Sequence, residues 1–111
     1  MTTVYRLKSR QDFQFVYENG KSLADRRLVL YYVSKPNQLS RVGFSAGKKL
    51  GKAVIRNRAK RLLREAFRNC YSEIRPGFDI ILIGRKGTIN VKEQVVERSL
   101  VELLEKAGLF L

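Results

Sequence analysis

Residues 47–68, GKKLGKAVIRNRAKRLLREAFR, combine the densest positive charge of the chain with its clearest helical periodicity. Nine of the 23 Lys and Arg residues lie in this stretch, against a single acidic residue, Glu65. At about 100° per residue, an apolar stripe follows one side of the predicted helix and the basic residues occupy the other side. The stripe consists of Ile55, Ala59, Leu62, Leu63, Ala66, Phe67 and Cys70. The stretch therefore predicts a helix that is both a core element and a candidate contact surface.

The polar residues of this stretch are the candidate binding residues. Guanidinium groups in a row along a helix suit phosphate groups, and an amide among them can contact a phosphate or a base edge. A solvated charged face without a ligand is the alternative interpretation, because charged stretches are common. The candidates are Lys48, Lys49, Lys52, Arg56, Asn57, Arg58, Lys60, Arg61, Arg64 and Arg68.

Composition and charge favour one folded domain with an anionic partner. A chain of 111 residues is long enough for one core and too short for two, so we expect a single domain over residues 1–111. The formal net charge is +13, and residues 1–87 hold 20 basic and 6 acidic side chains, whereas residues 88–111 hold 3 and 4. Such a chain repels itself unless a polyanion neutralises it. Nucleic acid is therefore the leading partner class, and the last segment is expected to be scaffold.

Several classes of function lack the residues that they need. The chain has no histidine and one cysteine, Cys70, which excludes an internal disulfide and multi-cysteine metal sites and removes the commonest general base. The loop before the helix does not match a nucleotide-binding P-loop, because only three residues separate Gly47 from Gly51 and Ala53 follows Lys52. We therefore predict no catalytic residue, no set of metal ligands and no organic cofactor. Cys70 is expected to pack as an apolar residue.

The sequence also indicates where the protein acts. No apolar run approaches the roughly 20 residues that a membrane-spanning helix needs. The N-terminus lacks the apolar core of a signal peptide. We expect a cytoplasmic protein with no membrane partner, and the sequence does not fix its oligomeric state.

The order of the predicted elements indicates an α+β fold. A capping pattern at Ser9 and Asp12 predicts a short helix that runs to about Asn19 and ends at Gly20. Both faces of residues 26–33 are apolar, which predicts a central strand that is covered on both sides. The later elements are an antiparallel partner strand at residues 41–46, the basic helix to about Asn69, a buried strand at residues 78–83 and a final helix that ends at Gly108. With one further β-like turn-back to which we assign no residues, the order is α-β-β-β-α-β-α, which predicts a single-domain sandwich in which helices pack on a small mixed sheet.

Three aromatic residues, Phe13, Tyr17 and Tyr31, admit two interpretations. Phe13 and Tyr17 share one face of the first helix, and Tyr31 lies on one face of the predicted strand. Exposed rings could stack on unpaired bases, at about 1–3 kcal/mol per base. Buried rings would be ordinary core. Spacing in the sequence does not decide between the two.

The chain resembles a known family at these residues. Residues 48–67, KKLGKAVIRNRAKRLLREAF, are similar to the signature of the bacterial ribonuclease P protein component, including its Arg-Asn-Arg core at residues 56–58. The similarity extends over most of the chain. Lys52 stands where an asparagine is frequent and Phe15 where the family often has a polar residue, but the motif is intact. The other matching positions are Asp12-Phe13 with Tyr17, Asn19-Gly20, Val29-Leu30-Tyr31, and Arg41-Val42-Gly43 with Ser45.

The resemblance implies a fold, a function and a set of site residues. In that family a left-handed β-α-β crossover passes through the basic helix, against the general right-handed preference. The protein is an accessory subunit that binds a catalytic RNA and the 5′ leader of precursor tRNA, and it assists endonucleolytic removal of that leader. The RNA mainly holds the Mg²⁺ ions that perform the hydrolysis. The basic loop and helix are then RNA-binding, and the leader lies in a cleft formed by Phe13, Tyr17, Val29 and Tyr31.

Two other functions stand as alternatives. A general single-stranded RNA-binding protein, or a ribosome-associated protein without a nuclease partner, would carry a similar charge. A stand-alone nuclease would need a general base or a metal site, which the sequence does not offer. Preference for precursor tRNA over mature tRNA separates the first alternative from the function that the resemblance implies.

Overall fold

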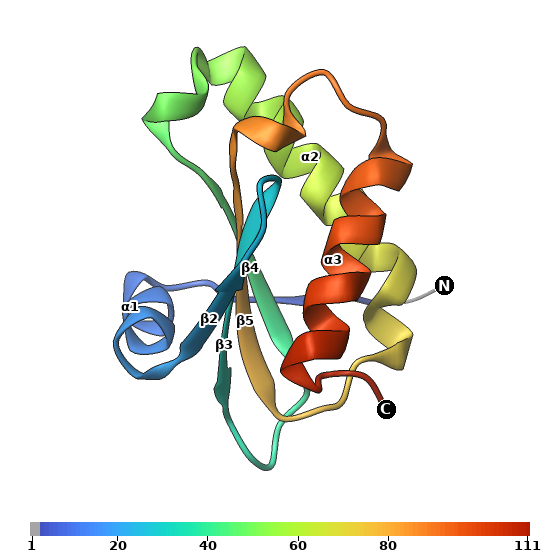
Figure 1. Cartoon of the computed structure of the whole chain (residues 1–111). Coiled ribbons are helices and arrows are strands. Elements are labelled where there is room, and N and C mark those ends of the chain that lie inside the picture. The colour runs from blue at the N-terminus through green and yellow to red at the C-terminus, as the bar shows by residue number, and fades with distance from the viewer. Residues whose placement is uncertain (1–2) are drawn as a thin grey trace.

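The computed structural model describes residues 3–111, which form a five-stranded mixed sheet and three α-helices (Figure 1). The predicted α+β class is confirmed, and so is the order α-β-β-β-α-β-α from the first helix onward. The sequence patterns predict neither β1 nor the residues of β2. The elements are β1 (Tyr5–Arg6), α1 (Arg10–Asn19), β2 (Lys21–Ala24), β3 (Leu28–Ser34), β4 (Arg41–Ala46), η1 (Lys48–Leu50), α2 (Ala53–Cys70), η2 (Tyr71–Glu73), β5 (Phe78–Gly84), η3 (Lys86–Thr88) and α3 (Glu93–Ala107).

The ends of α1 follow from local chemistry. Ser9 is the N-cap, and its hydroxyl accepts a hydrogen bond from the backbone N–H of Asp12 at 3.0 Å. The helix ends at Gly20, whose N–H donates to the carbonyl of Val16 at 2.8 Å. A Cβ at Gly20 would lie 2.7 Å from the carbonyl oxygen of Tyr32, so only glycine fits there. These contacts confirm the predicted start and stop of the helix.

The sheet has the strand order β1-β4-β5-β3-β2, with β5 at its centre. Helices α2 and α3 cover one face and α1 covers the other (Figure 1). Alternation along β3 sends Leu28 and Leu30 into the larger apolar cluster, which contains residues of α2 and α3, and Tyr31 and Val33 towards the smaller cluster around Val16. The prediction that this strand is central and covered on both sides is confirmed.

The predicted pairing of residues 41–46 is wrong. β4 does not pair with β3: it runs parallel to β5 and to β1, and β3 pairs antiparallel with β2 and β5. The connection between β3 and β4 passes around the start of β5, where the N–H of Lys35 donates to the carbonyl of Gly77 at 2.7 Å. In the same connection the hydroxyl of Ser40 accepts from the N–H of Phe78 at 3.1 Å. The chain thus passes the start of β5, and β5, the most buried strand, lies between β3 and β4.

The connection from β4 through α2 to β5 is a left-handed crossover. The two strands are parallel neighbours, and α2 lies on the face that faces right in Figure 1. In that view the strands run upward, β2 lies nearest the viewer and β5 therefore lies in front of β4. The chain thus moves from the rear strand through the helix on the right to the front strand. This is the handedness that the family resemblance implies.

The apolar stripe of α2 faces the sheet and α3, as predicted. Ala59, Leu63, Ala66, Phe67 and Cys70 are buried, and Ile55 and Leu62 are half-buried at the edges. Burial, with smaller contributions from nearby glutamates, raises the pKa of the Cys70 thiol to about 12. The cysteine is a packed core group, as the sequence predicts.

Cys70 should therefore be inert towards thiol reagents in the folded protein. With a pKa of about 12, roughly one thiol in ten thousand is ionised at pH 8, and the side chain is also inaccessible. We expect the native protein to react with a disulfide reagent at least about 100-fold more slowly than the urea-unfolded chain. Equal rates in the two states would contradict this description of the core.

Candidate nucleic-acid interface

An aromatic face lies between α1 and the sheet. α1 presents Phe13 and Tyr17 one turn apart, and β3 presents Val29 and Tyr31 on the facing side of the sheet. The rings of Tyr17 and Tyr31 meet edge to face, with centroids 5.1 Å apart and planes at 87°. Tyr17 is 41% exposed, whereas Phe13, Val29 and Tyr31 are half-buried. The structure thus brings the four predicted leader-binding residues to one surface, and the rings are neither fully core nor fully free.

Phe13 rests directly on β4. A methyl group at Gly43 would lie 2.6 Å from Cε2 of the Phe13 ring, so the ring lies where a side chain would otherwise project from the strand. Phe13 and Tyr31 both pack against the small buried cluster of Leu7, Val16 and Ile81. The glycine therefore sets how closely this part of α1 approaches the sheet.

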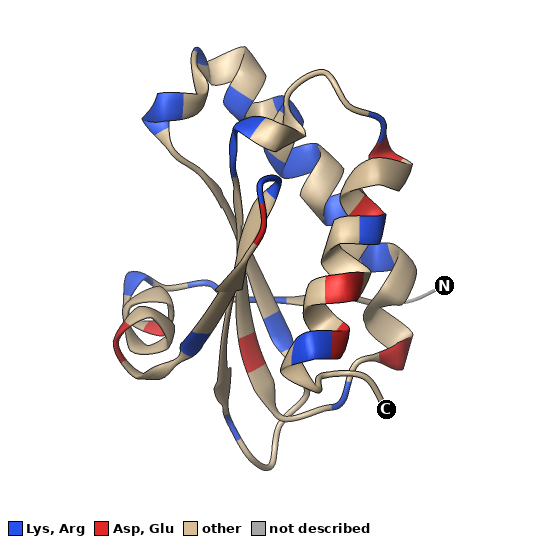
Figure 2. Cartoon of the chain, in the orientation of Figure 1, with Lys and Arg blue, Asp and Glu red and all other residues tan. Residues whose placement is uncertain are grey.

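The N-terminal half of α2 and its lead-in are cationic (Figure 2), and most of the basic side chains there are exposed. The first turn contains no acidic residue, and the N-cap Lys52 makes no side-chain capping bond. Positive charge at the positive end of a helix dipole is unfavourable in the free protein, and an incoming anion relieves it. The exposed candidates are Lys48, Lys49, Lys52, Asn57, Arg58 and Arg61, and the half-buried ones are Arg56, Lys60 and Arg64.

The C-terminal end of α2 is different because acidic side chains surround it. Arg68 donates to the carboxylate of Glu65 at 3.1 Å. Asn69 donates to Glu97 at 2.7 Å and to Glu93 at 3.3 Å, and both acceptors belong to α3. Burial and the neighbouring Glu97 raise the pKa of Glu93. Arg68 therefore stands apart from the other candidates, and its role in binding stays a prediction.

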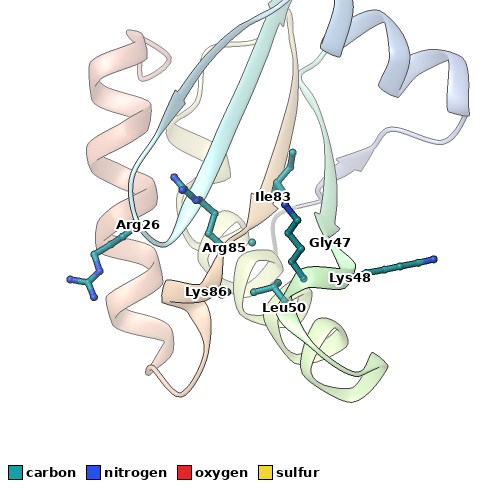
Figure 3. Close-up of a pocket in the computed structure, with 9 residues that line it drawn as sticks. Arg26, Gly47, Lys48, Leu50, Ile83, Arg85 and Lys86 are labelled. Atoms are coloured by element: carbon teal, nitrogen blue, oxygen red, sulfur yellow. The ribbon is translucent and has the colours of Figure 1, made fainter.

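A basic pocket of about 670 Å³ adjoins the aromatic face. Its floor includes Ile83 of β5, which is paired with Val29 in the sheet and also packs against the cluster that holds Phe13 and Tyr31. Figure 3 shows Arg26 and Lys48 extending away from the pocket on opposite sides. The cationic residues that line it are Arg26, Lys48, Lys49, Arg85 and Lys86. The aromatic face and these cationic side chains therefore follow one another along the same side of the sheet.

Sequence reasoning missed three residues of this pocket. Arg26 precedes β3, and Arg85 and Lys86 follow β5, so they meet the Lys48-Lys49 loop only in the folded chain. The sequence does contain one sign of this pocket, the basic pair Arg85-Lys86 directly after the buried strand. Loops that follow strands often carry binding residues.

Within residues 3–111, no three His, Cys, Asp or Glu side chains come together in a way that could hold a metal ion. In the same part of the chain, no helix is long and apolar enough to cross a membrane. The surface instead offers guanidinium, ammonium and amide donors beside partly exposed aromatic rings. Such a surface suits a single-stranded polyanion whose bases are free to stack.

Comparison with known proteins agrees with this geometry. A family model described as ribonuclease P matches residues 1–108. This chain belongs to the ribonuclease P protein family. It is 44% identical over 110 residues to the ribonuclease P protein component of Oceanobacillus iheyensis, with 98% of this chain and 91% of the relative covered.

Solved structures of the family share the fold. The RNase P protein of Staphylococcus aureus superimposes with a TM-score of 0.85 at 37% identity, covering 98% of this chain and all of that one. The protein from Thermotoga maritima gives a TM-score of 0.81 at 36% identity, covering 91% and 96%. The chain is thus a protein component of ribonuclease P, a subunit of an endoribonuclease of tRNA processing, and its partner in that ribonucleoprotein is RNA.

The cationic candidates on α2 lead to a prediction about the salt dependence of RNA binding. Replacing Arg61 by Ala should weaken binding to the RNA subunit and reduce the log–log salt slope by about 0.7–0.9, because one phosphate contact is lost. Lys106→Ala on α3 is the charge-matched control and should leave the slope unchanged. Binding titrations between about 50 and 200 mM salt measure both. Equal slopes for the two variants would show that only net charge matters.

Proposed function

We propose that this chain binds the catalytic RNA of ribonuclease P and the 5′ leader of precursor tRNA, and thereby assists removal of the leader. The basic loop and the N-terminal half of α2 would bind backbone phosphates, and the aromatic face would take unpaired leader nucleotides. The observation that carries the proposal is that the aromatic face adjoins the basic loop: Ile83 lines the pocket that contains Lys48 and Lys49, and it packs against the same buried cluster as Phe13 and Tyr31.

The aromatic face favours a single strand over a duplex. A stacked base needs an accessible ring face, and Tyr17 is 41% exposed beside Tyr31. Unpaired bases gain about 1–3 kcal/mol each from such contacts, whereas bases in a helix already stack on each other. A leader is unpaired, and mature tRNA lacks it, so this surface would distinguish the two.

The catalytic groups are proposed to reside in the RNA. Mg²⁺ prefers carboxylate and water oxygens, but the donors on this surface are lysines, arginines and Asn57. They do not suit that ion, so we place the Mg²⁺ ions of the holoenzyme on the RNA. This chain would contribute binding and orientation of the substrate. We place the complex in the cytoplasm together with its tRNA substrates.

Reconstitution with a cognate catalytic RNA tests the proposal. At low Mg²⁺ concentration, where electrostatic repulsion between the two RNAs is poorly screened, the protein should increase kcat/KM for precursor cleavage. It should also bind precursor tRNA more tightly than mature tRNA in the holoenzyme. An equal affinity for both tRNAs would instead indicate a general RNA-binding protein. No gain in cleavage over the RNA alone would reject the proposal.

Substitution of single aromatic residues tests the leader site. Tyr17→Ala should lower the affinity of the holoenzyme for precursor tRNA by about tenfold, and should leave mature tRNA and catalytic RNA affinities unchanged. Phe15→Ala is a matched control, because Phe15 is 40% exposed on the same helix and lies about 200° further around it. Its ring is covered by Lys35, whose Nζ lies 3.9 Å from the ring centroid. A similar loss in both variants would argue against a leader site at Tyr17.

A further inference from the structure

Helix α1 carries half of the aromatic face, and its apolar contact with the sheet is made chiefly by Val16 and Phe13. Of its ten residues only Val16 is buried, and Phe15 and Tyr17 are about two-fifths exposed. The distance between Tyr17 on the helix and Tyr31 on β3 depends on where α1 sits on the sheet. Contacts that fix this helix therefore also fix the geometry of the aromatic face.

A buried carboxylate in the sheet orients Arg41. Asp79 of β5 is completely buried and lies directly opposite Arg41 of β4 in the register. Arg41 donates from Nε to Oδ1 at 2.9 Å and from Nη2 to Oδ2 at 2.7 Å, and Gln38 donates to Oδ1 at 3.2 Å. Two parallel hydrogen bonds hold the guanidinium plane in one orientation. The hydrogen bond to Asp79 is the main reason why the pKa of Arg41 is raised.

The remaining terminal nitrogen of Arg41 points at α1. Its Nη1 lies 3.5 Å from Oδ2 of Asp12, and both side chains are about one-quarter exposed. Partial burial raises the pKa of Asp12, but the charge of Arg41 and hydrogen bonding to Ser9 outweigh this and lower it overall. Asp12 immediately precedes Phe13, whose ring lies on Gly43, two residues beyond Arg41 on the same strand. α1 and β4 thus meet at the ion pair between Asp12 and Arg41 and, next to it, where the Phe13 ring packs on Gly43.

The contact to Asp12 is not needed to satisfy Asp79. That carboxylate already accepts three hydrogen bonds, from Arg41 and Gln38. A partly exposed ion pair at 3.5 Å also contributes little to global stability. What the Asp12 contact adds is a direct polar link between α1 and the Arg41–Asp79 ion pair of the sheet.

We propose that Arg41 and Asp12 are positioning residues for the leader: anchored by Asp79, Arg41 holds Asp12 and so places Phe13 and Tyr17 at the correct distance from Tyr31. This inference rests on the proposed function, because it assigns the aromatic face to the leader. It predicts that loss of the Asp12 charge weakens leader binding without loss of the fold.

Asp12→Asn is the appropriate variant, since it removes the charge and keeps the size of the side chain. Arg41 itself is left intact, because its removal would leave Asp79 buried without a cation. Glu18→Gln is the matched control: it removes the same charge from the same helix, where Glu18 accepts a hydrogen bond only from Gln14 within α1. Asp12→Glu retains the charge and should restore part of any loss.

In the holoenzyme, the wild-type preference for precursor over mature tRNA should fall about three- to fivefold in Asp12→Asn, as loss of a partly exposed ion pair allows. The affinities for mature tRNA and catalytic RNA should not fall, and Glu18→Gln should keep the full preference. Unchanged preference in Asp12→Asn, or an equal fall in both variants, would overturn the proposal. Global unfolding of Asp12→Asn would also overturn it, because the residue would then serve the fold as a whole.

A measurement without RNA separates this proposal from the proposed function. The Phe13 ring should shift the NMR signal of the Gly43 α-protons, because the ring packs directly on this glycine. The shift should decrease in Asp12→Asn and persist in Glu18→Gln and Asp12→Glu. An unchanged shift in Asp12→Asn would show that the ion pair does not position α1. The wild-type holoenzyme could show no preference for precursor tRNA while the Gly43 shift still decreases in Asp12→Asn. In that case the assignment of the aromatic face to the leader is wrong, but the role of the ion pair in positioning α1 is supported.

Discussion

The fold depends on one strand that has to be buried on both faces. Asp79, Ile80, Ile81 and Leu82 of β5 are all completely buried, so this strand takes the centre of the sheet with β3 on one side and β4 on the other. Because β4 is parallel to β5, the chain has to cross over between them, and α2 is that crossover. Its apolar stripe covers the sheet, and its charges can only face outward. The cationic outer face of α2, the proposed RNA-binding surface, is thus a consequence of how the core is built.

The free protein carries an electrostatic cost that its partner removes. The net charge is +13, the first turn of α2 lacks an acidic residue, and basic side chains crowd around the pocket beside η1. These features destabilise the native state through repulsion and favour association with a polyanion. Any ligand that binds only the folded chain shifts the folding equilibrium towards it. Binding and folding stability are therefore coupled in this small domain.

Local patterns in the sequence predict the elements well and their pairing poorly. The amphipathic α2, the Ser9 cap and the apolar β5 follow from neighbouring residues, and all three are confirmed. The partner of β4 depends on which strand fills the centre, which no local pattern contains. The contact of Tyr17 with Tyr31 and the basic pocket likewise join separate segments. Only the family resemblance predicts the left-handed crossover, since the general preference is for right-handed connections.

The two ends of α2 differ in charge, and this difference bears on how the protein is oriented when it approaches RNA. Glu65 neutralises Arg68, and the glutamates of α3 accept from Asn69, while the opposite end of the helix stays bare and cationic. The charge distribution therefore has a direction as well as a magnitude. In the field of a polyanion this asymmetry would exert a torque on the protein and turn its cationic end towards the anion before contact. If the cationic candidates bind RNA as proposed, such orientation would shorten the search for the productive encounter and would leave the side of α3 facing away from the nucleic acid.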